Sequence, residues 1–215
     1  MKKIAILGTG IVGNTLGTKL VSLGHAVMMG SRTENNEKAE AWVKQNGTLA
    51  SHGTFLDAAA SAEIIFNCTS GQVSLEALQL AGRENLQGKI LVDLANPLDF
   101  SKGMPPSLTI CNTDSLGETI QRQFTDVKVV KTLNTLNCEM MVNPDLLKDP
   151  GSLFICGNDA DAKAEINSLL RTFGWENIID LGDISASRGM EQLLPVWVRL
   201  MVTLGTNKFN FSIVK

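Results

Sequence analysis

The sequence lacks most of the residues on which acid–base and metal sites are usually built. It contains no tyrosine and only two histidines, and neither His25 nor His52 lies in a metal or catalytic motif. Its four cysteines are scattered without C-x-x-C spacing, which indicates reduced, mostly buried thiols rather than metal ligands or a disulfide framework. The sequence therefore offers no Ser-His-Asp set and no catalytic Tyr-Lys pair, and no metal site is predicted.

Runs of one charge and long apolar runs are also missing. The net charge is −3 and there is no basic run, so nothing indicates a nucleic-acid partner. The longest apolar stretch near the C-terminus, residues 193–202, contains Arg199 and is shorter than the roughly 20 apolar residues of a membrane helix. It predicts a packing helix and no membrane association. An apolar strand is expected from Ile4 onward, which leaves no room for a signal peptide, so we predict a cytoplasmic protein.

The sequence does contain a glycine-rich motif directly after an apolar strand. Residues 4–7 form the apolar run, and a G-x-G-x-x-G loop follows without a gap and opens a helix. In such a loop one glycine makes the tight bend, one lets backbone N–H groups approach a pyrophosphate, and one lets helix and strand pack closely. The helix N-terminus adds unpaired N–H groups and a positive dipole. The alternative is a glycine-rich turn without a ligand, but strand, loop and helix in this order favour a dinucleotide site. Its predicted residues are Gly8, Thr9, Gly10, Ile11, Val12 and Gly13.

Apolar strands alternate with helical segments along the rest of the chain. Strands are predicted at residues 4–7, 26–30, 48–51, 64–68, 89–94, 127–131, 153–157 and 177–181. Helices are predicted after the glycine loop and at residues 34–45, 55–60, 73–81, 115–124, 160–173 and 187–204, the last with a kink or break near Pro195. This alternation predicts an α/β Rossmann fold, a doubly wound, mainly parallel sheet of about eight strands with helices on both faces.

The sheet accounts for residues 1–182, which we assign to a nucleotide-binding Rossmann domain. Residues 183–215 are predicted to form a short C-terminal helical extension of the same compact unit. These residues are too few for the helical substrate domain of about a hundred residues that many Rossmann dehydrogenases carry, so loops of the Rossmann domain, the last helix or a neighbouring subunit should bind the substrate. The last helix is apolar nearly all round, which predicts a homodimer through it; burial within one subunit is the alternative.

The residues that follow the second strand predict which dinucleotide binds. A cofactor with a free ribose 2′-hydroxyl usually meets an Asp or Glu at this point, but the first acidic residue here is Glu34. Ser31 can donate its hydroxyl to a 2′-phosphate, and Arg32 can stack on the adenine and donate guanidinium N–H groups to that phosphate. Lys38, one turn into the next helix, is a further candidate. We therefore predict NADP(H) rather than NAD(H); the alternative is that Arg32 and Lys38 are ordinary surface charges.

Several further motifs occur in order along the chain. They are Gly30-Ser31-Arg32, Lys128-Val129-Val130-Lys131 with Leu133-Asn134-Thr135, Cys156-Gly157-Asn158-Asp159, and Ser187-Arg188 with Glu191 and Leu194-Pro195. Together with the glycine loop they resemble the NADPH-dependent F420 reductase family (F420-dependent NADP oxidoreductases) nearly end to end. Similar domains occur in membrane ferric reductases. The resemblance implies hydride transfer between NADP(H) and a deazaflavin, coenzyme F420, in which the cofactors hold the reactive atoms and the protein aligns them.

The resemblance also indicates where the second substrate binds. In the family, the turn after the strand that corresponds to residues 127–131 lines the hydride-transfer pocket. Asn134 and Thr135 occupy those positions here, and Leu136 offers an apolar wall. The alternative is that Asn134 only satisfies the backbone of the turn.

Two other strand ends carry polar residues. Thr69 and Ser70 follow the strand at 64–68 and should border the nicotinamide and its phosphates, and Asn96 follows the strand at 89–94. Open parallel sheets bind ligands at the carboxyl ends of their strands, which supports these positions. Thr69 and Ser70 have a helix N-cap as their alternative role, and Asn96 a structural turn.

Three functions are compatible with the sequence. The leading hypothesis is hydride transfer to a deazaflavin. The first alternative is the same reaction with a flavin, a quinone or an iron complex as the acceptor. The second alternative is a sensor that binds NADPH without turnover. A sensor is usually joined to an effector domain, for which this chain offers no room. On the last helix, Arg188 and Glu191 are three positions apart and are spaced to pair with each other.

Overall fold

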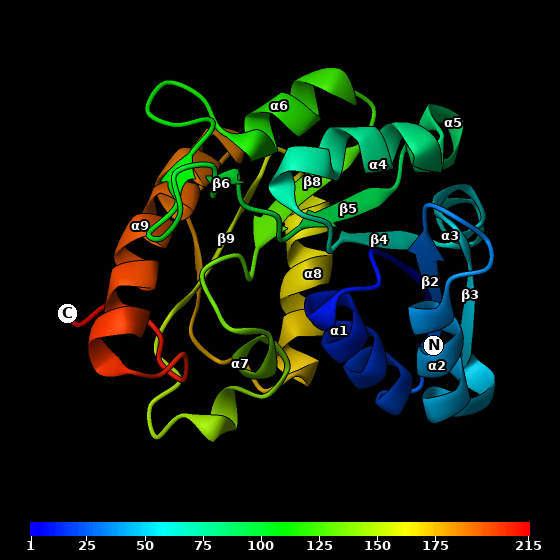
Figure 1. Ribbon diagram of the computed structural model, residues 1–215, viewed down its shortest axis with the longest axis horizontal. Helices are drawn as coiled ribbons and strands as arrows, with labels where there is room; N and C mark the ends of the chain where they lie inside the picture. Colours follow the sequence, from blue (N-terminus) through cyan, green and yellow to red (C-terminus); the bar gives the residue numbers. More distant parts are fainter.

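The strands form one eight-stranded sheet and a separate two-stranded ribbon. The computed structural model describes residues 1–215 (Figure 1). The large sheet contains β1 (Lys3–Leu7), β2 (Ala26–Ser31), β3 (Ala50–Thr54), β4 (Ile64–Asn67), β5 (Ile90–Asp93), β8 (Lys128–Thr132), β9 (Leu153–Gly157) and β10 (Ile178–Asp180). The ribbon pairs β6 (Leu98–Asp99) with β7 (Ser107–Leu108). The predicted α/β architecture with eight main strands is confirmed.

The order of the strands creates a crevice at one edge of the sheet. The order is β10-β9-β8-β5-β4-β1-β2-β3. The six strands from β3 to β8 are parallel, whereas β9 pairs with β8 in the antiparallel sense and β10 is parallel to β9. From β1 the sheet grows first toward β3 and then, through β4, in the other direction. Dinucleotides bind outside the carboxyl ends of the strands at such a switch point. The glycine loop after β1 and Thr69 after β4 both lie there.

Helices cover both faces of the sheet. They are α1 (Ile11–Ser22), α2 (Glu37–Asn46), α3 (Phe55–Ser61), α4 (Ser74–Ala81), α5 (Arg83–Leu86), α6 (Leu116–Gln123), α7 (Cys138–Val142), α8 (Ala160–Thr172) and α9 (Ser187–Leu204). One buried cluster joins the sheet to α1, α2, α7 and α8, and a second joins it to α3, α4, α5, α6 and the start of α9. In Figure 1, α4, α5 and α6 lie along the top of the molecule and α1, α2 and α7 lie lower down.

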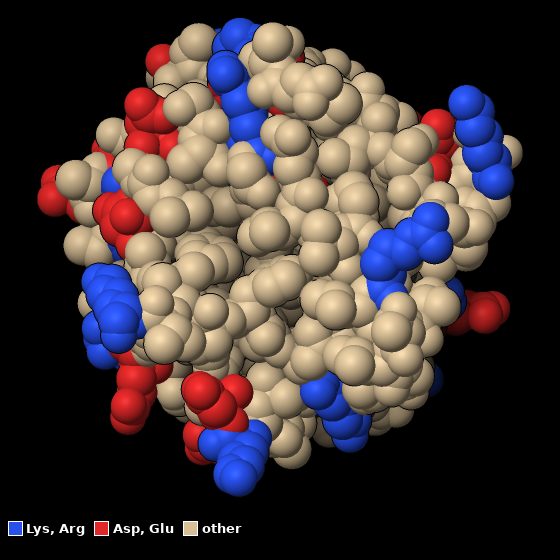
Figure 2. Space-filling model, turned by 90° about the vertical axis from the view of Figure 1, so that its left-hand side faces the viewer, with Lys and Arg blue, Asp and Glu red and all other residues tan.

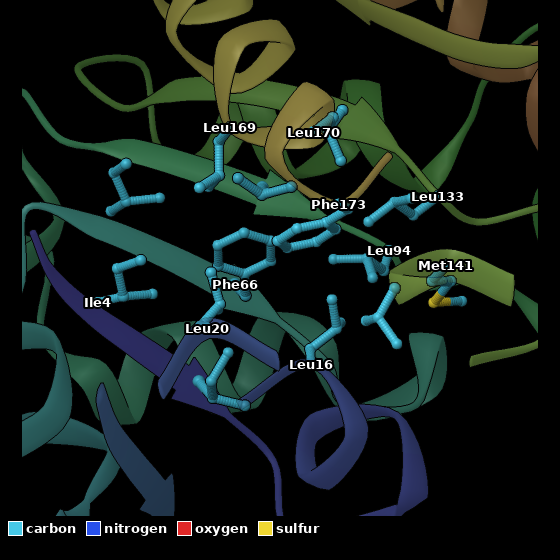
Figure 3. Packing of buried hydrophobic residues seen from close by; sticks show 14 of the residues in the cluster. Ile4, Leu16, Leu20, Phe66, Leu94, Leu133, Met141, Leu169, Leu170 and Phe173 are labelled. Carbon is cyan, nitrogen blue, oxygen red and sulfur yellow. The ribbon is translucent and has the colours of Figure 1, made fainter. Parts of the chain in front are cut away.

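Successive side chains of β1 belong alternately to the two hydrophobic clusters. Ile4 and Ile6 belong to the first cluster, and Ala5 and Leu7 to the second, as expected of a strand buried on both faces. The first cluster continues from the centre of the sheet to the carboxyl ends of its strands. Figure 3 shows this continuity through Leu16, Leu20, Phe66, Leu94, Leu133, Met141, Leu169, Leu170 and Phe173. The core thus supports the residues at the crevice directly.

The last helix, α9, is one helix from Ser187 to Leu204 with Pro195 inside it, so of the kink or break predicted there a break does not occur. Proline lacks the backbone N–H that would bond to the preceding turn. Leu194 and Val198 on either side of it are buried and hold the helix against the molecule. No helix of the structure combines the length and the apolar character that crossing a membrane requires.

Candidate cofactor and substrate site

The three glycines of the loop between β1 and α1 have separate physical roles. Gly8 has a φ of +121°, and a Cβ there would lie 2.8 Å from the carbonyl oxygen of Cys68. A Cβ on Gly13 would lie 2.2 Å from the carbonyl oxygen of Gly8, so this glycine permits the close contact between helix and loop. Gly10 faces open space, and α1 has neither a side-chain cap nor an acidic residue in its first turn. The start of α1 is therefore open to an anion such as a pyrophosphate.

The end of β2 carries the residues predicted to select the dinucleotide. Ser31 is buried, and its hydroxyl donates a hydrogen bond to the carbonyl oxygen of Thr33. The Arg32 side chain is 65% exposed, and its guanidinium lies 3.8 Å from the Glu76 carboxylate. Lys38 lines a shallow groove beside the glycine loop. Arg32 and Lys38 are thus available to a phosphate group, whereas the Ser31 hydroxyl would first have to leave Thr33.

A cavity of about 240 Å³ opens at the carboxyl ends of β4, β5 and β8. Ten of its fifteen lining residues are hydrophobic, and none is charged or a histidine. Since ligand pockets usually measure about 300–1,000 Å³, this cavity suits one ring system rather than a whole dinucleotide. Of the predicted residues, it brings together Val12, Thr69, Ser70, Asn96, Asn134 and Leu136. Thr135 is buried and does not line it. Lining residues that were not predicted include Cys68, Leu94, Phe100, Met141, Leu194 and Trp197.

Asn134 is held rigidly in the cavity wall. Its Nδ2 donates to Asn96 Oδ1 at 2.9 Å and to the carbonyl oxygen of Met190 at 3.1 Å, and Asn96 Nδ2 donates to the Asn134 carbonyl oxygen at 2.8 Å. Asn134 Oδ1 is buried and has no hydrogen-bond partner. Leu133, the preceding residue, has a φ of +62°, a conformation that costs a non-glycine residue on the order of 1–3 kcal/mol. An unpaired acceptor beside a strained residue is typical of a ligand contact.

Thr69 and Ser70, at the end of β4, do not cap the helical turn that follows them. The Thr69 hydroxyl donates to Asn67 Oδ1 at 2.7 Å. Ser70 is exposed, and its side chain makes no capping bond. A Cβ on Gly71 would lie 2.1 Å from the carbonyl oxygen of Asn96, so the turns after β4 and β5 contact each other directly. Ser70 therefore presents an unengaged hydroxyl at this side of the cavity.

Both the sequence and the structure are similar to those of known reductases. Residues 3–97 match the family described as NADP oxidoreductase, coenzyme F420-dependent. A solved structure from Arthrobacter sp. FB24, named as a candidate F420-dependent NADP reductase, is 50% identical with a TM-score of 0.95, and the match covers 100% of both chains. The chain belongs to the F420-dependent NADP oxidoreductase family.

Two curated relatives extend the comparison. The F420-dependent NADP reductase of Methanocaldococcus jannaschii is 28% identical, over 93% of this chain and 92% of its own length. The metalloreductase STEAP3 of Rattus norvegicus is 30% identical over 94% of this chain, but the match spans only 39% of that protein. The predicted family, the class of NADP-dependent oxidoreductase and NADP(H) as the dinucleotide are confirmed.

The cavity has one titratable side chain in its wall, the Cys68 thiol. Burial, and secondarily the Asp93 carboxylate, raises the pKa of Cys68 far above its ordinary value. The thiol therefore stays protonated at neutral pH and is not a nucleophile. The wall can orient and enclose a ring, but it supplies no acid–base pair.

A buried ionic cluster lies behind the cavity wall of the oxidoreductase. Lys131, Asp93 and Glu191 are each at most 1% exposed, and Lys131 Nζ lies 2.7 Å from Asp93 Oδ2 and 2.9 Å from Glu191 Oε1. The expected pairing of Arg188 with Glu191 is wrong, because Arg188 pairs with Glu118 instead. The one sequence signal for the cluster is a charge at the end of each of two apolar strands. Its third member is 60 positions beyond Lys131 along the chain, which no local pattern reveals.

Proposed function

We propose that the enzyme transfers a hydride between NADP(H) and a deazaflavin of the coenzyme F420 type, and that the deazaflavin ring binds in the cavity beside Asn134. The observation that carries this proposal is the cavity, with mainly apolar walls, no acid–base pair and one unpaired buried acceptor. Apolar walls with a few polar atoms suit a flat aromatic ring. The M. jannaschii relative, named as an F420-dependent NADP reductase, supports the same acceptor.

The glycine loop would hold the dinucleotide. Its fit is supported by Gly10, which leaves open space in front of the first turn of α1. Backbone N–H groups of residues 10–13 would bind the pyrophosphate. Arg32 and Lys38 would neutralise the 2′-phosphate, and Ser31 would join them once its hydroxyl leaves Thr33.

Thr69, Ser70 and Asn96 would border the nicotinamide from the ends of β4 and β5. The two cofactors supply the hydride chemistry themselves. The protein contributes alignment of the two rings and exclusion of water. Asn134 would position the ring through Oδ1, and the buried Thr135 would support the turn.

The distribution of surface charge indicates whether the ring or the charged tail of the acceptor would be recognised. On the side of the molecule where α9 lies, Lys and Arg side chains are scattered over a mostly uncharged surface (Figure 2). A negatively charged coenzyme tail meets no dense basic cluster on this face, so ring contacts would supply most of the affinity. A site that recognises mainly the ring would also accept flavins. The similarity to the STEAP3 metalloreductase makes a flavin or a ferric complex the second candidate acceptor.

Turnover assays separate these acceptors. The purified protein is mixed with NADPH and, in separate reactions, with oxidised coenzyme F420, FMN, a quinone or ferric citrate, and absorbance reports NADPH oxidation. We expect the fastest oxidation with coenzyme F420. Turnover with FMN or ferric citrate but not with coenzyme F420 would contradict the deazaflavin assignment, and tight NADPH binding without any turnover would favour a sensor.

Replacement of Asn134 tests the acceptor site itself. Asn134→Ala removes the unpaired acceptor and the bonds to Asn96 and Met190, so kcat/KM for the acceptor should fall about tenfold or more. The Kd for NADPH should change little. Asn85→Ala, on α5, removes a comparable amide-to-carbonyl hydrogen bond remote from the cavity and serves as the control. Equal effects of the two variants on kcat/KM would contradict the role of Asn134.

We also propose that residues 183–215 extend the Rossmann domain of residues 1–182 within one compact unit and mediate a homodimer through α9. The support for this is the exposure of Val196, Val202 and Leu204 on that helix. A helix face of this kind is stabilised when a second apolar surface covers it.

A further inference from the structure

We infer that Lys131, Asp93 and Glu191 are positioning residues that fix the walls of the acceptor cavity relative to one another, although none of the three lines the cavity. The inference rests on the proposed function in so far as the cavity binds the acceptor. It assigns to these buried charges a role in the geometry of hydride transfer that goes beyond stabilising the fold.

The cluster is centred on one ammonium group. Lys131 Nζ contacts Asp93 Oδ2 at 2.7 Å and Glu191 Oε1 at 2.9 Å, and it donates a further hydrogen bond to the carbonyl oxygen of Ala95. Burial lowers the pKa of Lys131, but the two carboxylates outweigh this effect and hold its pKa above the ordinary value. The ammonium therefore stays charged, and all three of its N–H groups are engaged.

The second carboxylate is balanced by the start of α6. Glu191 Oε2 accepts a hydrogen bond from the Leu116 N–H at 2.9 Å, and Oε1 accepts one from the Gly117 N–H at 3.1 Å. These are the first two residues of α6, where the helix dipole favours a negative charge. Asp93 Oδ1 accepts from Asn67 Nδ2 at 2.8 Å. Because every charged group has partners, the cluster can act as a rigid unit.

Hydrogen bonds and chain neighbours connect the cluster to different parts of the cavity wall. Ala95, which Lys131 holds through its carbonyl oxygen, lines the cavity at the end of β5. Asn134 lies three residues after Lys131 and is bonded to the carbonyl oxygen of Met190, the neighbour of Glu191.

On α9, Leu194 follows Glu191 by one helical turn and also lines the cavity. Asn67 donates a hydrogen bond to Asp93 and accepts one from the hydroxyl of Thr69, which lines the cavity at the end of β4. Loss of the charge at Glu191 would remove the ion pair that ties α9 to β8 and weaken the hydrogen bonds that the side chain accepts from the start of α6. A misplacement of about 1 Å at a reacting centre can reduce a rate about a hundredfold.

Two substitutions on α9 distinguish positioning from general stability. Glu191→Gln keeps the volume of the side chain and removes its charge. Arg188→Gln is the matched control, because it breaks the Arg188–Glu118 pair between the same two helices, and Arg188 does not line the cavity. For Glu191→Gln we expect kcat with the acceptor to fall about ten- to a hundredfold and the Kd for NADPH to stay within about twofold. For Arg188→Gln both values should stay near those of the wild type.

Tryptophan fluorescence provides a measurement that needs no substrate. Trp42 and Trp175 are fully buried, so of the three tryptophans only Trp197, in the cavity wall, is partly exposed and open to quenching by acrylamide. Trp197→Phe confirms this assignment by removing the quenched signal. Release of α9 should raise the quenching constant about twofold in Glu191→Gln and leave it unchanged in Arg188→Gln.

The two measurements separate failure of this inference from failure of the proposed function. If coenzyme F420 is not the acceptor, the quenching experiment still tests the cluster. Equal quenching and equal kcat in Glu191→Gln and Arg188→Gln would overturn the inference. If Glu191→Gln does not fold, Asp93→Asn is measured in the same way, since it removes the other carboxylate from Lys131; wild-type quenching in that variant would also overturn the inference.

Discussion

Arg32 is the residue through which the dinucleotide preference is most directly tested. Its side chain is held only by Glu76 at 3.8 Å, and exposed pairs of this kind contribute about 0–1 kcal/mol. The guanidinium is therefore free to turn to a 2′-phosphate, where each charged hydrogen bond contributes roughly 1.5–3 kcal/mol. Arg32→Asp should weaken NADPH binding about ten- to a hundredfold and leave NADH binding unchanged or stronger, as measured by titration calorimetry. Arg171→Asp, on α8, is the control, and an unchanged ratio of the two Kd values in Arg32→Asp would contradict the assignment.

For residues of the candidate site, the position beside one another was predictable from the sequence where they follow a strand directly. Asn134, Asn96 and Thr69 each follow an apolar strand, and the carboxyl ends of parallel strands meet at one edge of the sheet. Lys131 and Glu191 were not predictable as partners, because a buried ion pair between a strand and a distant helix depends on tertiary packing alone. The same holds for the part that Trp197 takes in the cavity wall, since an indole on an apolar helix has the same pattern whether it faces a second subunit or a ligand.

Among the structural elements, the turn from β1 to α1 allows cofactor binding to be separated from folding. Gly10→Ala adds a Cβ in open space, so the free energy of unfolding should change by less than about 1 kcal/mol, while NADPH binding weakens about tenfold because the pyrophosphate needs close backbone approach. Gly13→Ala places a Cβ 2.2 Å from the Gly8 carbonyl oxygen, and the overpacking should also lower stability by about 1–3 kcal/mol. Urea unfolding and NADPH titration of both variants measure the two effects. Wild-type NADPH affinity in Gly10→Ala would show that the loop does not hold the pyrophosphate.

The contact between α6 and α9 predicts a dependence of stability on pH. The hydrogen bond from Arg188 holds the pKa of Glu118 below its ordinary value, although burial opposes it. A carboxyl whose pKa is lower in the folded state stabilises the protein above its unfolded pKa of about 4.3, and this contribution is lost as the pH falls through the lower, folded value. Arg188→Gln should therefore be less stable than the wild type at neutral pH, and the difference should shrink below about pH 4. Urea midpoints across this range measure it; a difference that stays constant down to pH 3 would contradict this origin.

Strands were predicted well from the sequence where they are unbroken apolar runs. β4 and β5 are continuous apolar runs, as strands buried on both faces must be, and their predicted limits differ from the observed ones by one residue at most. The ribbon of β6 and β7 was not predicted, because two residues have no period to detect. Pro195 predicted a kink or break; a break does not occur, and Leu194 and Val198 on either side of Pro195 are buried.

At the scale of the whole molecule, the outer face of α9 exposes apolar side chains. Val202 and Leu204 are 65% and 56% exposed, and Val196 is half exposed near the cavity wall formed by Leu194. A second copy that covers this face would bury apolar area, which stabilises by about 25 cal/mol per Å², and would support the helix that encloses the cavity. Val202→Glu should therefore convert a dimer into a monomer in sedimentation, because a charge buried without a partner costs several kcal/mol. Leu80→Glu, at an exposed apolar position on α4, should leave the dimer intact. A wild-type protein that sediments as a monomer at micromolar concentration would rule out the dimer, and α9 would then be held only by contacts within its own subunit, which include the Lys131–Glu191 and Arg188–Glu118 ion pairs.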